Sequence, residues 1–245
     1  MKNNRIPKII GHRGAAGLAP ENTFSSLIKA VEMGLTYVEI DVKISKDKIP
    51  ILLHDDNLKR TAKINGLCSN YTYEELLKFD FGIWFSKKFK NEKILSLAKA
   101  LDFFYINNIG VNIELKPNKG KEKDNIESIT KVIKSKKILP NYFFSSFDTS
   151  SLKFVKRNFP NSPRGFLIDN YSFYDKKDII EICKELKCFC VGIDSNIANK
   201  NSINFFKKNK LKVNVYTINN LKFAKKLFLL GVSSIFTDRP DLVKF

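Results

Sequence analysis

Short apolar runs alternate along the chain with longer segments whose apolar residues recur at helical spacing. Residues such as Phe24, Leu27 and Val31 show the helical spacing. A strand followed by a helix, repeated eight times, predicts an α/β fold of the parallel (β/α)8 TIM barrel type. A doubly wound open sheet is the competing architecture, but it more often contains fewer strands. The eight strand-like runs are Lys8 to Gly11, Tyr37 to Lys43, Val111 to Leu115, Tyr142 to Ser145, Arg164 to Ile168, Phe189 to Ile193, Lys212 to Tyr216 and Ser234 to Phe236.

One segment interrupts this alternation. A second extended run, residues 49–54, follows Lys43 too soon for a helical crossover, which predicts an antiparallel hairpin. If the turn centres on residues 46 and 47, position 39 faces position 54 and position 41 faces position 52, so that His54 comes beside Glu39. Polar turns follow, with one short helix that opens at a Thr72-x-x-Glu75 capping box. We therefore expect residues 43–95 to form an inserted subdomain over the barrel mouth, within a single domain spanning residues 1–245.

The composition supports a folded protein outside the membrane. With 245 residues, of which 43% are hydrophobic, the chain can bury one large core. It contains no apolar stretch of membrane-spanning length, and its first 14 residues, MKNNRIPKIIGHRG, do not form a signal peptide. These features predict a cytoplasmic location and no stable membrane insertion. The four cysteines form no CxxC pair and lie far from both histidines in sequence, so we interpret them as ordinary reduced thiols.

The charge is strongly positive, because 43 basic and 25 acidic residues give a net charge of +18. Such a charge is compatible with nucleic acid, an anionic membrane or an anionic substrate. Lysine accounts for 37 of the basic residues and arginine, the preferred base-reading residue, for only six. This bias favours an evenly basic surface, with no nucleic-acid partner and with peripheral membrane contact left open. The sequence does not indicate an oligomeric state.

Three acidic residues are predicted to meet at one end of the barrel. Glu39 and Asp41 are two positions apart on a strand and project from the same face, and Glu114 lies near the end of the next barrel strand. On an exposed antiparallel strand this alternation would be routine. Inside a barrel, carboxylates without a counter-ion repel one another and resist desolvation. The set therefore predicts a site for one hard divalent cation, Mg²⁺ or Ca²⁺.

The two histidines of the chain, His12 and His54, both fall beside this acidic set. A single histidine is often structural, but two beside one acidic cluster indicate a pair that can accept and donate a proton. Arg13 and Lys116 lie next to candidate site residues. Two cations near a divalent ion point to a bridging anion, for which phosphate is the best fit. The alternative for Arg13 and Lys116 is a purely structural ion pair with the acids.

Taken together, these motifs resemble the glycerophosphodiester phosphodiesterase family. The resemblance runs from residue 9 to residue 242, and the combination of HRG, ExD, HD and ExK motifs is highly specific. The matching blocks are His12-Arg13-Gly14, Ala19 to Thr23, Val38 to Val42, Lys46-Asp47 before Ile51 to Asp55, Asn112 to Lys116, Ser145 to Asp148, Val215 to Asn219 and Phe236 to Pro240.

The resemblance implies a phosphatidylinositol-phosphodiesterase-like TIM barrel that hydrolyses a small-molecule glycerophosphodiester to sn-glycerol 3-phosphate and an alcohol. It implies a divalent cation on Glu39, Asp41 and Glu114, with His12 as the base and His54 as the leaving-group acid. The nucleophile is water or the glycerol's own secondary hydroxyl, which would give a cyclic phosphate first. Arg13 and Lys116 correspond to the family's phosphate contacts.

The substrate mouth departs from the family pattern at Tyr216, where a tryptophan is usual, which predicts a different head-group preference. Phe147 and Tyr216 are candidates for the apolar wall around the glycerol or alcohol, as are Trp84 and Phe85, although in a chain with 21 phenylalanines the pattern favours their interpretation as core residues. Two other functions remain: a lysophospholipase D or phospholipase-C-like hydrolase of the same fold that acts on lipid phosphodiesters, and a non-catalytic barrel that binds polyanions through its lysines.

Overall fold

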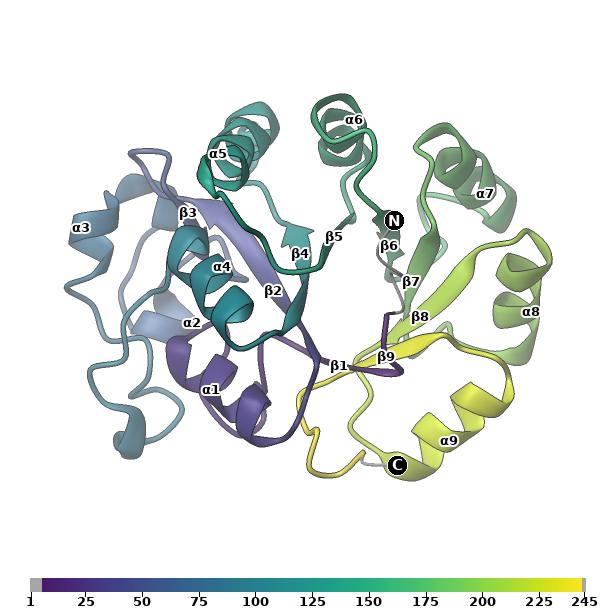
Figure 1. Ribbon diagram of the computed structural model, residues 1–245, viewed down its shortest axis with the longest axis horizontal. Coiled ribbons are helices and arrows are strands. Elements are labelled where there is room, and N and C mark those ends of the chain that lie inside the picture. Colours follow the sequence, from purple (N-terminus) through teal and green to yellow (C-terminus); the bar gives the residue numbers. More distant parts are fainter. Residues whose placement is uncertain (1–5, 244–245) are drawn as a thin grey trace.

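The computed structural model describes residues 6–243, which form a closed barrel of parallel strands surrounded by helices (Figure 1). This confirms the predicted (β/α)8 TIM barrel. The eight barrel strands lie within about one residue of the predicted runs. They are β1 (Ile9–Gly11), β2 (Tyr37–Ile44), β4 (Gly110–Leu115), β5 (Tyr142–Ser146), β6 (Arg164–Ile168), β7 (Cys190–Asp194), β8 (Lys212–Tyr216) and β9 (Ser234–Thr237).

The barrel closes at its first strand. Each strand from β4 to β9 pairs in parallel with its neighbour, and β1 pairs with both β9 and β2. In these pairs Gly11 is opposite Val38 on one side and opposite Thr237 on the other. The open-sheet alternative is therefore wrong, since an open sheet would leave two parallel strands unpaired at its edges.

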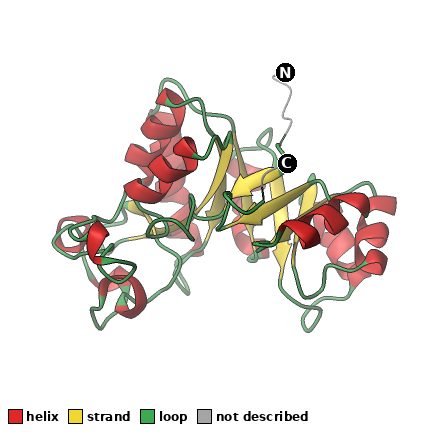
Figure 2. Ribbon diagram, turned by 90° about the horizontal axis from the view of Figure 1, so that it is seen from below, coloured by secondary structure: helices red, strands yellow, loops and turns green. Residues whose placement is uncertain are grey.

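Seven helices occupy the outside of the barrel within the described residues, and Figure 2 shows them flanking the strands. Their apolar faces pack against the outer side of the strands in two large clusters of buried residues. Most of them begin at a side chain that caps a backbone N–H, as Thr23 does before the first helix. The helices are α1 (Phe24–Glu32), α4 (Leu97–Ile106), α5 (Glu122–Ser135), α6 (Thr149–Asn158), α7 (Lys176–Glu185), α8 (Lys200–Lys208) and α9 (Leu221–Leu229).

On strand β2 apolar and acidic residues alternate, and the two kinds of residue lie on opposite sides of the strand. Val38, Ile40 and Val42 join the apolar layer between strands and helices. Glu39 and Asp41 project to the opposite, inner side, and both are buried. Strand β2 therefore carries its two acidic residues inside the barrel, where the side chains of neighbouring strands converge.

The hairpin after β2 is antiparallel as expected, but its predicted register is wrong by one residue. Strand β3 (Pro50–Leu52) pairs Leu52 with Val42, and the backbone N–H of Leu53 donates to the carbonyl of Asp41. The turn contains one residue more than expected, because Lys48 adopts a positive φ of 61° and both Lys48 and Ile49 donate hydrogen bonds to Ser45. His54 comes two residues after the end of β3 and still lies near Asp41 of β2.

Between β3 and α4 the chain forms short helices that lie beside the barrel, next to α1 and α4 (Figure 1). They enclose a small apolar cluster of their own, which includes Leu58, Cys68 and Phe81. The capping box at Thr72 and Glu75 is confirmed, because each side chain accepts a hydrogen bond from the other residue's backbone N–H. The elements are α2 (Lys59–Ala62), the 3-10 helix η1 (Cys68–Asn70), α3 (Tyr73–Leu76) and the 3-10 helix η2 (Lys87–Phe89).

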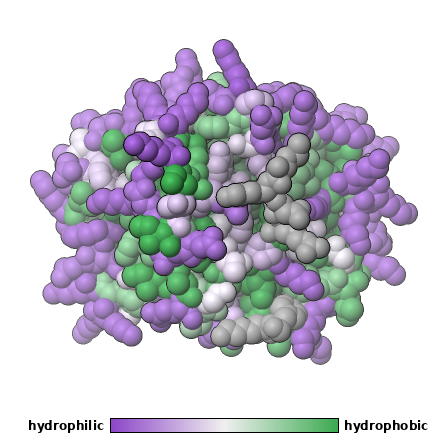
Figure 3. Space-filling view, in the orientation of Figure 1, coloured by the Kyte–Doolittle hydropathy of each residue, from purple (hydrophilic) through white to green (hydrophobic). Residues whose placement is uncertain are grey.

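Hydrophilic side chains make up most of the outline of the face shown in Figure 3, with hydrophobic patches between them. Among residues 6–243 there is no helix of the length and hydropathy that crossing a bilayer requires. All four cysteines are buried and free, in keeping with their interpretation as reduced thiols.

Candidate active site

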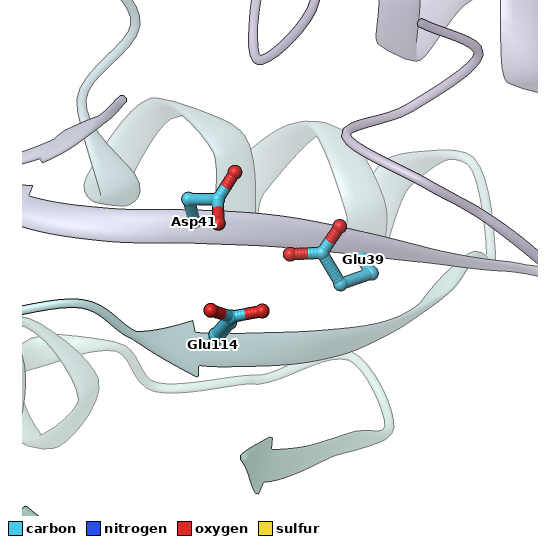
Figure 4. Close-up of side chains that lie close together, drawn as sticks. All are labelled: Glu39, Asp41 and Glu114. Atoms are coloured by element: carbon cyan, nitrogen blue, oxygen red, sulfur yellow. The ribbon is translucent and has the colours of Figure 1, made fainter. Parts of the chain in front are cut away.

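Glu39 and Asp41 on β2 and Glu114 on β4 point toward one another inside the barrel (Figure 4). One carboxylate oxygen from each lies within 4.8 Å of the others, and all three residues are buried. The strand register explains this meeting, since Asp41 is directly opposite Glu114 in the β2–β4 ladder. The predicted convergence of the three acids is therefore present in the structure.

The donor set fits a hard divalent cation. Oxygen Oε1 of Glu39 is buried and has no hydrogen-bond partner among the described residues. Burial raises the pKa of Glu39 well above its usual range, and Asp41 and Glu114 raise it further. Burial also acts to raise the pKa of Asp41, but Arg13 and Lys116 hold it well below its usual range. The protein's own cations thus stabilise part of the cluster and leave an oxygen-lined position with unbalanced negative charge, as Mg²⁺ or Ca²⁺ requires.

His12 follows β1 and is oriented by a residue from the other end of the chain. Its Nδ1 donates to Oδ1 of Asp238 at 2.7 Å, and its Nε2 lies 3.9 Å from Oε2 of Glu39. Asp238 is itself held by Asn219, whose Nδ2 donates to the second carboxylate oxygen at 2.9 Å. The imidazole is therefore fixed with Nε2 directed toward the acidic cluster, in the tautomer that Asp238 selects.

His54 is anchored in the same manner. Its Nδ1 donates to Oδ1 of the adjacent Asp55 at 2.7 Å. Burial lowers the pKa of His54; Asp41 opposes this effect, whereas Arg13 and Lys116 reinforce it. Both histidines line one small cavity of about 110 Å³ together with Glu39 and Glu114. Each ring therefore has Nδ1 bound to a carboxylate, and both residues line the cavity.

The two predicted cations border the same cavity. Nη1 of Arg13 donates to Glu21 at 2.7 Å, and its Nε lies 3.2 Å from Asp41. Nζ of Lys116 donates to Glu114 at 2.9 Å and lies 3.6 Å from Asp41. Both side chains thus form ion pairs with the acids, as expected if their role were purely structural. Both also line the cavity, where they could contact a bound anion.

Aromatic side chains form one wall of the cavity. Phe147 and Tyr216 pack edge to face, with ring centroids 5.9 Å apart, and both line the cavity. The Tyr216 hydroxyl donates to the carbonyl of Ile168 at 2.6 Å, which fixes the ring. Trp84 and Phe85, the other candidates for the wall, are not among the residues that line the cavity. They lie in the segment between β3 and α4 and pack against each other.

Several polar residues that support this site were not singled out from the sequence. Asp238 and Asn219 orient His12, and Asn22 exchanges two hydrogen bonds with Asp41. Asn112 lines the cavity, opposite Glu39 in the ladder, and its buried Oδ1 has no partner within residues 6–243. Arg60 links Glu21 to Asp55. Several of these residues lie inside motif blocks of the family resemblance, and this was the only sequence evidence that they belong near the site. Their supporting roles depend on contacts between residues far apart in the sequence.

Comparison with known proteins agrees with the arrangement of the site. The Bacillus subtilis (strain 168) protein YhdW is 32% identical over 238 residues, which cover 96% of both chains. A glycerophosphodiester phosphodiesterase from the same organism is 29% identical and covers 95% of this chain and 84% of its own. Among solved structures, an Oleispira antarctica phosphodiesterase in complex with the product sn-glycerol-3-phosphate superposes with a TM-score of 0.91 and 33% identity, covering 97% of this chain and 95% of that one.

The closed barrel, its polar mouth and these relatives define an enzyme of the phosphodiester hydrolase class. The model of the glycerophosphoryl diester phosphodiesterase family matches residues 12–242. The chain therefore belongs to the glycerophosphoryl diester phosphodiesterase family, as its motifs indicated.

Proposed function

We propose that the protein hydrolyses small glycerophosphodiesters to sn-glycerol 3-phosphate and an alcohol by metal-dependent acid–base catalysis. The observation that carries this proposal is the pair of imidazoles. Each is bound through Nδ1 to a carboxylate, and each lines the cavity that contains the acidic cluster. The product bound to the Oleispira antarctica relative supports the same substrate class.

Glu39, Asp41 and Glu114 would hold one divalent cation, Mg²⁺ or Ca²⁺. When bound, this ion supplies positive charge that stabilises phosphoryl oxygens in the transition state. Asn22 orients Asp41 through its amide, and the backbone N–H of Arg13 orients Glu39 by donating to Oε2 at 2.9 Å. Ligands held in this way keep their position whether or not substrate is present.

Arg13 and Lys116 would bind the non-bridging oxygens of the phosphodiester. Both side chains are already held by a carboxylate, Arg13 by Glu21 and Lys116 by Glu114, so that binding a phosphate requires little reordering of either one. Their positive charges would offset the negative charge that develops on the phosphoryl group during the reaction.

The two histidines would move the protons. Nε2 of His12 removes a proton from the attacking water, or from the glycerol's secondary hydroxyl in a route through a cyclic phosphate. His54 enters the step as the imidazolium, with Nδ1–H bound to Asp55, and donates its Nε2 proton to the departing alcohol oxygen, which leaves it neutral. Asp238 stabilises the His12 imidazolium that forms, since its carboxylate lies 2.7 Å from Nδ1.

The cavity favours a small substrate. Its volume of about 110 Å³ is below the several hundred Å³ of pockets that enclose drug-sized ligands, and it leaves no enclosed room for an acyl chain. Phe147 and Tyr216 would contact the carbon atoms of the glycerol or the alcohol. A lysophospholipase D or phospholipase-C-like activity would require the acyl chain to remain outside the barrel.

Turnover of glycerophosphocholine, glycerophosphoethanolamine and a long-chain lysolipid tests the proposal. We expect the first two to be hydrolysed in the presence of Mg²⁺ or Ca²⁺, and His12→Ala to lower kcat by about 10²-fold or more. Preferential hydrolysis of the lysolipid, with retention of the protein on anionic liposomes, would favour the lipid-directed alternative. Wild-type turnover in His12→Ala would exclude this histidine from the reaction.

The organisation of the chain belongs to the same proposal. Residues 1–245 would form one domain, of which residues 1–5 and 244–245 lie outside the described structure. Residues 43–95 would form the inserted subdomain, and its separate apolar cluster supports this division. The cytoplasmic location stays a prediction from the sequence.

A further inference from the structure

Arg60 makes the densest set of ionic hydrogen bonds near the candidate active site. It lies on α2, in the segment between β3 and α4, and its guanidinium bridges two carboxylates. Nε and Nη2 donate to the two oxygens of Asp55 at 2.7 and 3.0 Å. Nη1 and Nη2 donate to the two oxygens of Glu21 at 2.6 and 2.8 Å. Every nitrogen of Arg60 and every oxygen of the two carboxylates is therefore engaged.

Each carboxylate continues to a candidate catalytic or binding residue. Asp55 accepts from Nδ1 of His54, and Glu21 accepts from Nη1 of Arg13. A continuous series of hydrogen bonds thus links the imidazole of His54, through Arg60, to the guanidinium of Arg13, which is expected to bind phosphate. No residue of a barrel strand takes part in the section between His54 and Arg13.

We propose that Arg60 is a positioning residue that fixes the distance and orientation of His54 relative to Arg13, so that the segment between β3 and α4 completes the active site. The inference rests on the proposed function for its effect on turnover. A planar guanidinium that donates to two carboxylates in a plane fixes both distance and direction, which a lysine ammonium does not. The ring of Trp84, 5.7 Å from Cζ of Arg60, ties the bridge to the rest of the inserted segment.

Arg60→Lys and Arg60→Ala test the proposal by kinetics. We expect kcat to fall about 10- to 100-fold in both variants, because reacting groups displaced by about 1 Å lose rate on this scale. Millimolar guanidinium should partly restore Arg60→Ala, since the side chain is 39% exposed, whereas ammonium at equal ionic strength should not. Combining Arg60→Ala with His54→Ala should cost less than the product of the two single effects.

Arg239 provides a matched control. It donates two hydrogen bonds to Asp241, at 2.9 and 2.7 Å, with a side-chain exposure of 37%, and Asp241 contacts neither histidine. Arg239→Ala therefore removes a comparable exposed ion pair without touching the bridge. We expect its kcat to equal that of the wild type. An equal loss of kcat in both arginine variants, in proportion to their losses of thermal stability, would reduce Arg60 to a structural role and overturn the proposal.

A spectroscopic measurement keeps this proposal separate from the proposed function. The chain has only two histidines, so ¹⁵N-labelled imidazole spectra contain two ring systems that can be assigned with His12→Ala. Arg60→Ala should shift Nδ1 of His54 and leave His12 unchanged. If wild-type protein hydrolyses no glycerophosphodiester, the proposed function fails and this shift still tests the positioning. Unchanged His54 resonances would overturn the positioning role, whatever the activity.

Discussion

We expect a divalent cation bound to Glu39, Asp41 and Glu114 to stabilise the fold strongly. The variant Glu39→Gln tests this effect by removing one ligand charge. One oxygen from each of the three carboxylates lies within 4.8 Å of the others, so two ionised members repel each other by about 3.5 kcal/mol or more at an effective dielectric constant of ~20. A cation at 100 times its Kd should stabilise the wild type by about 2.7 kcal/mol. For a chain of this length, that corresponds to a rise in Tm of about 5 to 11 °C. Glutamine preserves shape and the hydrogen bond from Arg13, but removes one charge from the ligand set.

Thermal unfolding by circular dichroism, in EDTA and with Mg²⁺ or Ca²⁺, measures this effect without substrate. We expect Glu39→Gln to be at least as stable as the wild type in EDTA, because a like-charge repulsion has been removed, and to lose the cation-induced rise. Glu127→Gln is the control, since Glu127 is exposed and only pairs with Lys123 one helical turn away. The reasoning fails if Glu39→Gln keeps the wild-type rise, or if saturating Mg²⁺ and Ca²⁺ both leave the wild-type Tm unchanged.

Three further variants test separate parts of the structure. Asp238→Asn should lower kcat by about 10²-fold or more, because His12 and Asn219 donate to different oxygens of Asp238 and the amide replaces one of these acceptors by an NH2 donor; unchanged kcat would contradict this orientation. Asn112→Leu should raise Tm by a few degrees by removing a buried amide oxygen without a partner, and should weaken binding of sn-glycerol 3-phosphate in calorimetry. Arg164→Ala should cost about 3 to 5 kcal/mol in urea unfolding, since this buried guanidinium binds four backbone carbonyls, with kcat per folded molecule unchanged.

The strands could be predicted almost to the residue, because each barrel strand is a short apolar run flanked by polar turns. The convergence of Glu39, Asp41 and Glu114 was also predictable, since strand periodicity and barrel closure together determine which side chains meet. The register of the hairpin could not be predicted. It depends on the positive φ of Lys48, and lysine has no special preference for that conformation.

The supporting residues were harder to predict for a different reason. Asp238 meets His12 across 226 positions of sequence, and Arg60 meets Glu21 across 39. No local pattern encodes such contacts, and an acidic residue in a loop is most often simply solvated. The motif blocks indicated that these loops belong near the site, whereas the hydrogen bonds could be assigned only from the folded structure.

The contact between His12 and Asp238 bears on how the protein becomes active during synthesis. The loop after the first barrel strand carries the imidazole, and the loop after the last strand carries its carboxylate partner. A ribosome that has reached residue 220 has produced both histidines and all three acids, but neither strand β9 nor this partner. Nascent chains should therefore be inert toward phosphodiesters in the cell until the final strand has emerged and docked.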